Sequence, residues 1–400
     1  MMQQKSLEKI NFNIVVNRKN TNCLKYDFAV RRGRPENVLP LWVADMDFKV
    51  APEITQAIEK RVAHGIFGYS EVKEEYFEAV SAWMEQKHGW HVKEDWLVKT
   101  PGVVFALAMA VQAFTEPGDA VIIQQPVYYP FSEVIADNGR RIVDNTLELK
   151  EDGKYHINFE DFEQKVKENH VKLFLLCSPH NPVGRVWTKE ELEKLVRICR
   201  KNGIIIVSDE IHFDITRKEH TVISTVDGGC GDICIVCTAV SKSFNAAGLS
   251  TSNIIIENEA LRKRFKAQID ADGYSCINAF AYPATHAAYT ACDEWLDEMN
   301  ARINKNFDIF EKTLRETMPK IHFCPREGTY MAWLDVSCFN IPADESKAVF
   351  FARNTGFLPN DGDWFEGDGN THIRVNLAVA EETLLRFIES LKKSYDEHVK

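Results

Sequence analysis

The sequence of 400 residues lacks any apolar run that approaches the length of a membrane span, which needs about 20 consecutive apolar residues. Its first residues, M-M-Q-Q-K-S-L-E-K-I, lack the apolar core of a secretory leader, so we expect no export signal. Positive charge is also scarce, because 48 Lys and Arg face 59 Asp and Glu, a formal net charge of −11. This acidic balance disfavours nucleic acid and anionic membrane surfaces as partners, and we predict neither.

The ten cysteines show no arrangement that demands a disulfide framework or a metal. In a long chain without an export signal they indicate reduced thiols, which predicts a cytoplasmic location. Cys230, Cys234 and Cys237 have C-x3-C-x2-C spacing, which could ligate an iron–sulfur cluster. However, the last two lie in an expected strand, where they would face opposite sides. His88 and His91 flank a Gly-Trp turn without a third ligand. We therefore predict no metal site.

From Trp96 onward, apolar runs of strand length alternate with helical patterns. Between the strands, residues 103–114 and 188–203 are expected helices, the second with a capping box made by Thr188 and Glu191. Such alternation predicts an α/β fold with a three-layer architecture, a mostly parallel sheet with helices on both faces. The expected strands are residues 96–100, 120–124, 171–177, 204–207, 234–240 and 253–257.

The last third of the chain changes character. A long amphipathic helix is expected over 295–318, strands over 328–336 and 371–377, and a terminal helix over 380–398. These elements predict a smaller α+β domain, which the loop-rich N-terminal segment could join. We therefore expect a large domain of residues 49–288 and a small domain built from residues 1–48 and 289–400.

Polar or aromatic side chains follow the ends of the expected strands. Asn181 follows 171–177, Asp209 follows 204–207, Lys242 follows 234–240 and Tyr128 follows 120–124, while the helix that begins at Val103 follows 96–100. Each residue alone has an ordinary interpretation as a surface lysine, a cap, a turn or core. In open α/β sheets, however, the carboxyl ends of the strands face one ligand-binding crevice. Together these residues therefore predict a single site.

This set of groups matches what pyridoxal 5′-phosphate requires. Its aldehyde needs an amine, and its pyridine nitrogen needs a carboxylate that keeps it protonated, so that the ring accepts electrons. Its phenolic oxygen needs a donor, its ring a stacking partner and its phosphate the N–H groups of a helix N-terminus. A desolvated lysine stays partly neutral, as Schiff-base chemistry requires. The sequence thus predicts pyridoxal 5′-phosphate as the cofactor.

Eight segments carry a resemblance to a known family. Through them the chain resembles the fold-type I, pyridoxal-phosphate-dependent aminotransferase superfamily. It resembles more closely the bacterial MalY/PatB-type cystathionine β-lyase and C–S lyase group, which includes cystalysin. The resemblance spans essentially the whole chain. The segments are L-W-V-A-D-M-D-F (41–48), H-G-I-F-G-Y (64–69), P-V-Y-Y-P-F (126–131), C-S-P-H-N-P-V-G-R-V-W (177–187), S-D-E-I-H (208–212), S-K-S-F-N-A-A-G-L (241–249), G-T-Y-M-A-W (328–333) and H-I-R-V-N-L-A (372–378).

The resemblance implies catalytic roles for residues around the cofactor ring. Lys242 holds the cofactor as a Schiff base and then moves the proton. Asp209 pairs with the pyridine nitrogen, and Asn181 bonds the phenolic oxygen. Tyr128 stacks on the ring, with Tyr129 beside it.

It also implies how phosphate and substrate are held. Arg374 grips the α-carboxylate of the substrate, near Ala44 and Asn181. Tyr69 reaches the phosphate from the partner subunit, so a homodimer is expected. The remaining phosphate contacts are Val103, Val104 and Ser241.

The sequence departs from the wider aminotransferase pattern near the lysine. Ser250 stands where an arginine usually clamps the phosphate, and Ala239 where a serine is usual, which weakens the expected phosphate grip. His212 replaces a tyrosine beside the phenolic oxygen, as in the lyase group, and a histidine that titrates near neutrality could alter the electronics of the ring. Val240 and Ser243 replace the proline and threonine expected in that group, and both flank the chemistry.

The resemblance implies a β-eliminating carbon–sulfur lyase. Its substrate would be a sulfur amino acid such as L-cystathionine or cysteine, and its products a thiol or sulfide, pyruvate and ammonia. An aminotransferase on the same scaffold remains an alternative, since it shares the first steps and the fold does not separate the two. The second alternative is a regulatory protein that retains the cofactor as a conformational ligand.

Overall fold

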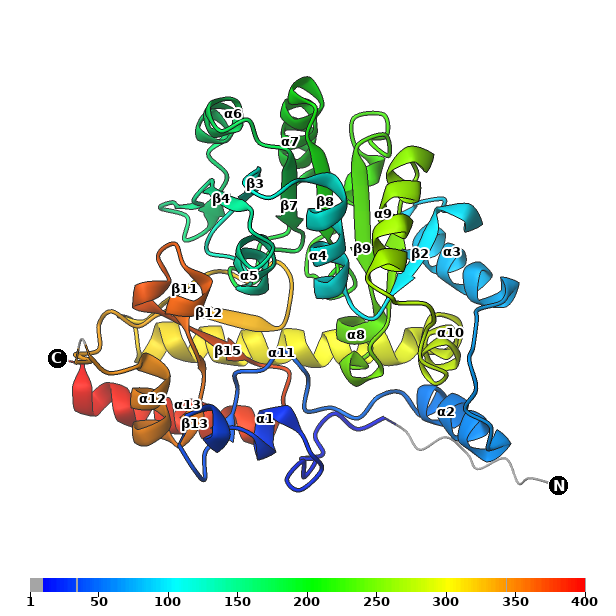
Figure 1. Ribbon diagram of the computed structural model, residues 1–400. Coiled ribbons are helices and arrows are strands. Elements are labelled where there is room, and N and C mark those ends of the chain that lie inside the picture. Colours follow the sequence, from blue (N-terminus) through cyan, green and yellow to red (C-terminus); the bar gives the residue numbers. More distant parts are fainter. Residues whose placement is uncertain (1–9, 34, 343, 400) are drawn as a thin grey trace.

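The centre of the protein is a seven-stranded sheet with the strand order β2-β10-β9-β8-β7-β3-β4. All neighbouring strands in it run parallel, except that β10 is antiparallel to both β9 and β2 (Figure 1). The predicted mostly parallel sheet is therefore confirmed. Its strands are β2 (Leu97–Thr100), β3 (Ala120–Ile123), β4 (Arg141–Asp144), β7 (Leu173–Cys177), β8 (Ile205–Asp209), β9 (Cys234–Thr238) and β10 (Ser252–Ile255).

This computed structural model describes residues 10–33, 35–342 and 344–399. The first residues, on which the expectation of no export signal rests, lie outside this part of the chain. Within it, no helix is both long enough and apolar enough to cross a bilayer.

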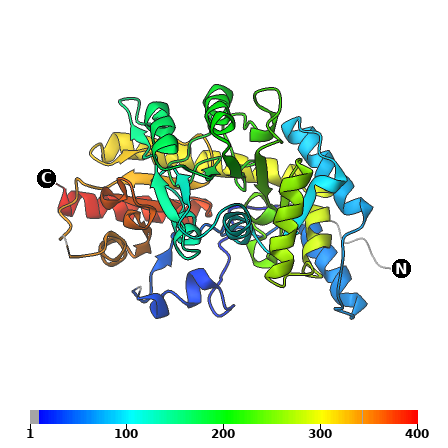
Figure 2. The same cartoon turned by 45° about the horizontal axis from the view of Figure 1, so that its top comes forward.

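Helices cover both faces of the sheet (Figures 1 and 2). Alternate strand residues point to opposite sides, so Leu173 and Leu175 join one buried layer while Phe174 and Leu176 join the other. The first layer packs under α4 (Val103–Phe114), α5 (Pro130–Ala136) and α9 (Glu259–Ala271), and the second under α6 (Phe159–Glu168) and α7 (Lys189–Asn202). The capping box of Thr188 and Glu191 is present at the start of α7.

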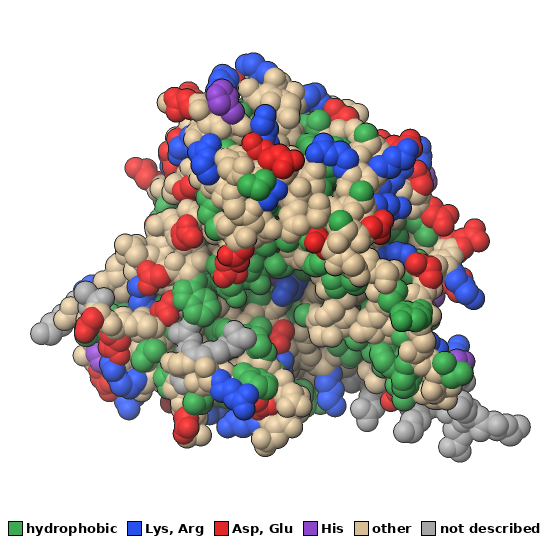
Figure 3. All heavy atoms as spheres, viewed as in Figure 1, with side chains coloured by type: hydrophobic (Ala, Val, Ile, Leu, Met, Phe, Trp, Pro, Cys, Tyr) green, Lys and Arg blue, Asp and Glu red, His purple; other side chains and the backbone are tan. Residues whose placement is uncertain are grey.

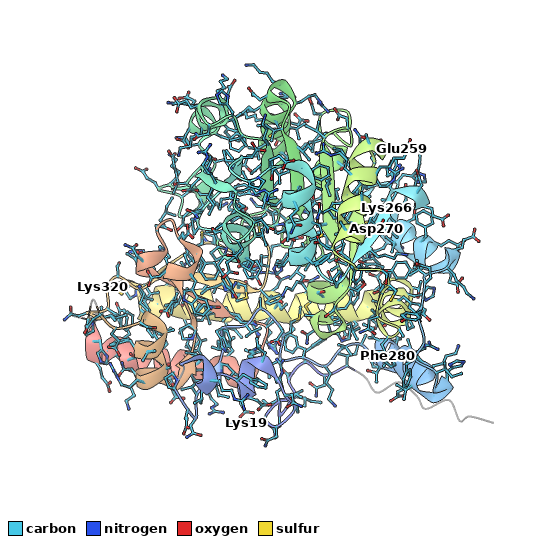
Figure 4. The ribbon with its side chains drawn as sticks, in the orientation of Figure 1. Lys19, Glu259, Lys266, Asp270, Phe280 and Lys320 are labelled. Atoms are coloured by element: carbon cyan, nitrogen blue, oxygen red, sulfur yellow. The ribbon has the colours of Figure 1, made fainter. Side chains whose placement is uncertain are left out.

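The exposed side of α9 mixes both signs of charge. Glu259, Lys266 and Asp270 follow one another along this helix and are exposed (Figure 4). Its basic residues Lys263, Arg264 and Lys266 are therefore part of a solvated helix face of mixed charge rather than a basic patch, whereas Arg262 is buried.

A second sheet of four strands, with the order β11-β12-β15-β14, lies below the first. All of its strand pairs are antiparallel. The helix α11 (Asp293–Thr317) runs beneath the large sheet and across into this unit (Figure 1). The N-terminal segment also reaches it, because β1 (Leu39–Pro40) pairs in parallel with β13 (Phe357–Leu358). The other elements here are β11 (His322–Phe323), β12 (Met331–Asp335), β14 (Asn360–Asp361), β15 (His372–Asn376), α12 (Lys347–Thr355) and α13 (Glu381–His398).

Four further helices and one hairpin complete the framework used below. They are α1 (Leu24–Asp27), α2 (Pro52–His64), α3 (Glu74–His88), α10 (Ala281–Ala291) and the hairpin of β5 (Glu148–Leu149) with β6 (Tyr155–His156). In addition, the chain forms the single turn α8 (Val240–Ser243), where the sequence predicted that a strand continued to Val240. The strand ends instead at Thr238, because the chain must turn there to bring Lys242 to the edge of the sheet.

The cysteine and histidine motifs are explained by packing. Cys230 and Cys234 lie in the buried layer that faces α7, whereas Cys237 lies in the layer on the other side of the sheet. His88 bonds Asp214 at 2.9 Å, while His91 is exposed and contacts Glu85. Across residues 10–33, 35–342 and 344–399, no group of three or more His, Cys, Asp or Glu side chains is arranged to hold a metal.

Candidate active site

Several of the predicted site residues, among them Lys242, Asn181 and Arg374, lie where the two sheets meet. The turn α8, which carries Lys242, and the strand β15, which carries Arg374, both approach the middle of the view in Figure 1. Figure 3 shows a hollow between the upper and lower parts of this face, lined largely by hydrophobic side chains, with a Lys or Arg side chain inside it. Hydrophobic walls exclude water and strengthen electrostatic interactions within such a hollow.

Lys242 places its amine inside the protein. Its Nζ donates a hydrogen bond to the backbone oxygen of Ala44 at 2.6 Å. Burial lowers the pKa of Lys242 to about 8; the carboxylate of Asp45 opposes this change and the guanidinium of Arg374 adds to it. A substantial fraction of this amine is thus neutral near neutral pH, as an attack on a carbonyl carbon requires.

Asp209 ends β8 and lies between neighbouring strands, level with Cys177 and Cys237. Its side chain accepts a hydrogen bond from the backbone N–H of Ile211 to Oδ1 at 3.1 Å. Burial raises the pKa of Asp209 from 3.8 to about 7. A cationic partner would lower this pKa again, so that the buried carboxyl group would be ionised near neutral pH.

Arg374 is a buried guanidinium with neutral neighbours. It is 2% exposed and donates to Asn181 Oδ1 at 3.1 Å, Trp42 O at 2.9 Å and Asn360 Oδ1 at 2.7 Å. Its Nε has no partner among the described residues. The ring of Phe365 lies 4.6 Å from the guanidinium carbon and fixes its plane. Burial lowers the pKa of Arg374 to about 10. Because no described acidic side chain pairs with this buried cation, the site favours an anionic ligand beside it.

Asn181 connects this guanidinium to the sheet. It lies in the loop after β7, where its backbone N–H contacts Cys177 Sγ at 3.4 Å and its backbone oxygen accepts from Tyr128 N at 3.0 Å. Its side-chain oxygen faces Arg374, and no described residue accepts from its Nδ2 group. The amide N–H₂ is therefore free to donate to a ligand oxygen.

The backbone around Ala44 is held in place by Asn245, which follows the turn α8, and by Asn376, which ends β15. Asn245 donates to Met46 O at 3.0 Å and accepts from Met46 N at 2.9 Å. From β15, Asn376 donates to the backbone oxygens of Val43 and Asp45 at 2.8 and 2.7 Å. These bonds clamp the loop of residues 42–48, so that the Ala44 oxygen points at the amine of Lys242.

Sequence reasoning assigned no role to Tyr330, Asn245 or Asn376. Tyr330 is fully buried and its hydroxyl donates to the same Ala44 oxygen at 2.7 Å. Tyr330 and Asn376 lie in segments that carried the family resemblance, and Asn245 lies in the lysine motif, so the sequence marked these positions. It gave no indication that they converge on one loop.

His212 lies on the floor of the site. Its ring is 3% exposed, contacts Tyr330 edge-on at 5.5 Å, and its Nδ1 has no partner among the described residues. Burial holds the pKa of His212 well below its ordinary value, and the charges of Lys242 and Arg374 lower it further. The suggestion that it titrates near neutrality is therefore wrong, because the ring is neutral throughout that range.

The N-terminus of α4 offers an anion site beside the lysine turn. Gly102 precedes it with φ +143°, which favours glycine, and the N–H groups of Val103 and Val104 belong to the first turn, where the helix itself supplies no acceptor. Ser241 comes from α8. Ser250 occupies the position where an arginine usually clamps the phosphate. It is an exposed residue in a left-handed turn, with φ +49°.

The two tyrosines after β3 lie at the site, and Tyr69 does not. The rings of Tyr128 and Tyr129 are 5.1 Å apart, and Tyr129 meets the ring of Trp364 edge-on at 5.6 Å. Burial raises the pKa of Tyr128 above its usual range, so its hydroxyl stays protonated. Tyr69 is 99% exposed in an irregular segment, and no hydrogen bond or ring contact joins it to the described residues of the site in its own chain.

Comparison with known proteins agrees with this geometry. Residues 36–391 match the family model "Aminotransferase class I and II". The chain belongs to this family. It is 40% identical over 385 residues to cystathionine beta-lyase PatB of Bacillus subtilis, covering 96% of this chain and 99% of that protein. It is 30% identical to protein MalY of Escherichia coli, over 95% of this chain and 97% of that one.

Solved structures of this aminotransferase family superpose on the whole chain. Cystalysin from Treponema denticola, which contains a pyridoxal 5′-phosphate cofactor, has 37% identity and a TM-score of 0.92, and the match covers 98% of this chain and all of that one. The pyridoxal-phosphate-bound C–S lyase from Staphylococcus hominis has 33% identity and a TM-score of 0.90, over 97% and 99% of the two chains. The resemblance to the C–S lyase group is therefore confirmed.

The raised pKa of Asp209 predicts a pH-dependent stability of the cofactor-free protein. The folded state binds this proton more tightly than the unfolded state, so its contribution to stability is present below about pH 4 and is lost as the pH rises through about 7. Asp209→Asn, which is neutral at every pH, should stabilise the cofactor-free protein at about pH 8 by up to about 4 kcal/mol, and much less at about pH 5. Thermal unfolding of both proteins at the two pH values checks this. An equal difference in Tm at both would contradict it.

Proposed function

We propose that this protein is a pyridoxal-phosphate-dependent carbon–sulfur β-lyase. It acts on a sulfur amino acid and yields a thiol or sulfide, pyruvate and ammonia. The observation that carries the proposal is one site holding a partly neutral lysine amine, an isolated buried carboxylate and a buried guanidinium without an acidic partner. The likeness to cystathionine beta-lyase PatB over nearly the full length of both chains supports the choice of reaction.

The buried polar groups fit the cofactor. Lys242 would hold its aldehyde carbon, and Asp209 would pair with the pyridine nitrogen, a cation that restores the charge of this carboxylate. The free amide N–H₂ of Asn181 would donate to the phenolic oxygen, next to the ring of His212. Tyr128 would stack on the ring. The N–H groups of Val103 and Val104, with the hydroxyl of Ser241, would hold the phosphate.

The residues of this chain then have separate tasks in the reaction. Arg374 binds the α-carboxylate of the substrate as a planar fork, and this orients the Cα proton toward Lys242. Lys242 removes that proton, while the bound cofactor supplies the electron sink for the pair left on Cα. The hydroxyl of Tyr330 keeps its bond to Ala44, so the loop stays in place when Lys242 moves. Tyr128, whose hydroxyl stays protonated, and Tyr129 would lie beside the route of the leaving thiolate.

We propose further that two chains share each site. Tyr69 projects into solvent at 99% exposure, and Val62, Ile66 and Phe67 nearby are 51%, 66% and 57% exposed, so an apolar surface surrounds it. The ring of Phe67 packs against that of Phe280, with ring centres 5.2 Å apart, and Phe280 lies at the lower right of Figure 4. A homodimer that buries this surface would bring Tyr69 to the phosphate of the partner's cofactor. Full activity of a monomer in light scattering would contradict this.

A cytoplasmic location is also proposed. All ten cysteines are free, as expected in a reducing compartment.

The reaction type can be tested without any keto acid. We expect L-cystathionine alone to give pyruvate and thiol over many turnovers, because a thiolate at Cβ leaves readily once the Cα proton is gone. L-Alanine, which lacks a leaving group, should react only by slow transfer of its amino group or by racemisation. Pyruvate and free thiol are assayed together with pyridoxamine phosphate. Stoichiometric conversion of the cofactor by cystathionine, with turnover only after a keto acid is added, would identify an aminotransferase instead.

A further inference from the structure

A second buried carboxylate, Asp214, lies behind the lysine turn. Its side chain is 2% exposed, and both of its oxygens are occupied. Oδ2 accepts from the hydroxyl of Ser243 at 2.6 Å, while Oδ1 accepts from Trp83 Nε1 at 3.2 Å and from His88 Nε2 at 2.9 Å. Since a carboxylate only accepts, His88 must be the donor in its pair. No Lys or Arg among the described residues forms an ion pair with Asp214.

These bonds join two helices, α3 and α11, to the turn that carries the catalytic lysine. Trp83 and His88 belong to α3, and His88 is stacked on Phe213 with 4.4 Å between ring centres. Asn300 of α11 donates its Nδ2 to the backbone oxygen of Asp214 at 2.8 Å. Ser243, the last residue of α8, is fully buried. Asp214 thus anchors α8 to elements that are themselves packed in the core.

The turn α8 needs such an anchor. It is four residues long, too short for its own backbone bonds to fix its orientation. Ser243 follows Lys242 directly, so the hydroxyl bond to Asp214 fixes the rotation of the turn about its axis. That rotation decides where the amine of Lys242 lies relative to the Ala44 oxygen and to the end of β8.

We infer that Asp214 is a positioning residue for Lys242, acting through the hydroxyl of Ser243. The inference rests on the proposed function, because it concerns a lysine that binds the cofactor and moves a proton. A purely structural contact would stabilise the fold but leave the reactivity of the lysine unchanged. The two roles are therefore separated by measurements on Lys242 itself.

The test compares three side chains at position 243. Threonine keeps the hydroxyl and valine has the same shape without it, so Ser243→Thr and Ser243→Val form a matched pair. In Ser243→Val we expect kcat to fall about tenfold or more, because a hydrogen bond to a charged group contributes a free energy of this size. The KM should stay within about twofold of the wild-type value. The rate at which the visible band forms when pyridoxal 5′-phosphate is added to the cofactor-free protein should fall similarly. Ser243→Thr should restore both. If Ser243→Val does not fold, Ser243→Ala takes its place.

A control variant reports on the loss of a serine–aspartate hydrogen bond elsewhere in the protein. Ser346 caps α12 and donates to Asp361 Oδ2 at 2.7 Å, in the other unit of the protein. Ser346→Ala should lower Tm but leave kcat and the rate of band formation unchanged. Equal kcat and band-formation rates in Ser243→Val and Ser243→Thr would overturn the inference. A wild-type protein in which borohydride fixes no cofactor on Lys242 would instead contradict the proposed function.

Discussion

Lys242→Ala should abolish turnover, with a loss of at least about 10⁴-fold in kcat. The substitution removes both the amine that holds the cofactor and the group that carries the proton, and proton transfer by a positioned side chain alone is worth about 10²- to 10⁴-fold. The neutral fraction of this amine depends on burial, which lowers its pKa to about 8. Pyruvate release from L-cystathionine and the visible absorption band are the measurements.

Two controls make the Lys242 result specific. Borohydride should bleach the band of the wild-type protein and fix the label on the peptide that contains Lys242, as mass spectrometry can show. Lys242→Arg keeps the positive charge but cannot form the Schiff base, so it should be as inactive as the alanine variant. Turnover near the wild-type level in either variant would refute the assigned chemistry.

The second large effect is expected at Arg374. Arg374→Ala should lose about 2–5 kcal/mol of transition-state binding in kcat/KM, the range for truncating one partner of a buried charge pair. The guanidinium is held by hydrogen bonds to Asn181, Trp42 and Asn360, which are all neutral. The carboxylate of the substrate would therefore supply the negative charge that the described residues do not place beside it. Arg374→Lys should recover only part of the loss, because an ammonium cannot present two parallel N–H donors.

A buried arginine elsewhere provides the matched control for Arg374. Arg262 of α9 is 8% exposed and pairs with Asp95 far from the site, so Arg262→Ala should affect Tm and not kcat/KM. If Arg374→Ala loses the cofactor band but keeps its KM for L-cystathionine, Arg374 does not bind the substrate carboxylate.

The site residues that the strand pattern assigned to one edge of the sheet share one property. Asn181, Asp209 and Lys242 follow consecutive parallel strands, and a parallel sheet brings the carboxyl ends of its strands to one edge whatever the loops do. Local pattern was therefore enough to predict that they meet. Arg374 lies on the other sheet, and only the family resemblance assigned it to the same site.

What the sequence did not predict depends on long-range contacts without a local pattern. The acceptor for Lys242 is a backbone oxygen 198 residues away, and any residue type could supply it. The low pKa of His212 follows from burial together with three cations, Lys242, Arg374 and Arg326, and neither cause can be read from S-D-E-I-H. For Ser250, the structure shows a left-handed turn, a constraint that a comparison of side-chain chemistry does not reveal.

The clamped loop of residues 42–48 has a consequence for folding. Asn245 holds it from the side of the large sheet, while Asn376 and Tyr330 hold it from the small one, so its geometry exists only when both units are folded. Neither unit can complete the site alone, and the loop couples their unfolding into one cooperative event. The Met46 amide, bonded to Asn245, should then exchange its hydrogen with solvent only through openings that separate the two sheets.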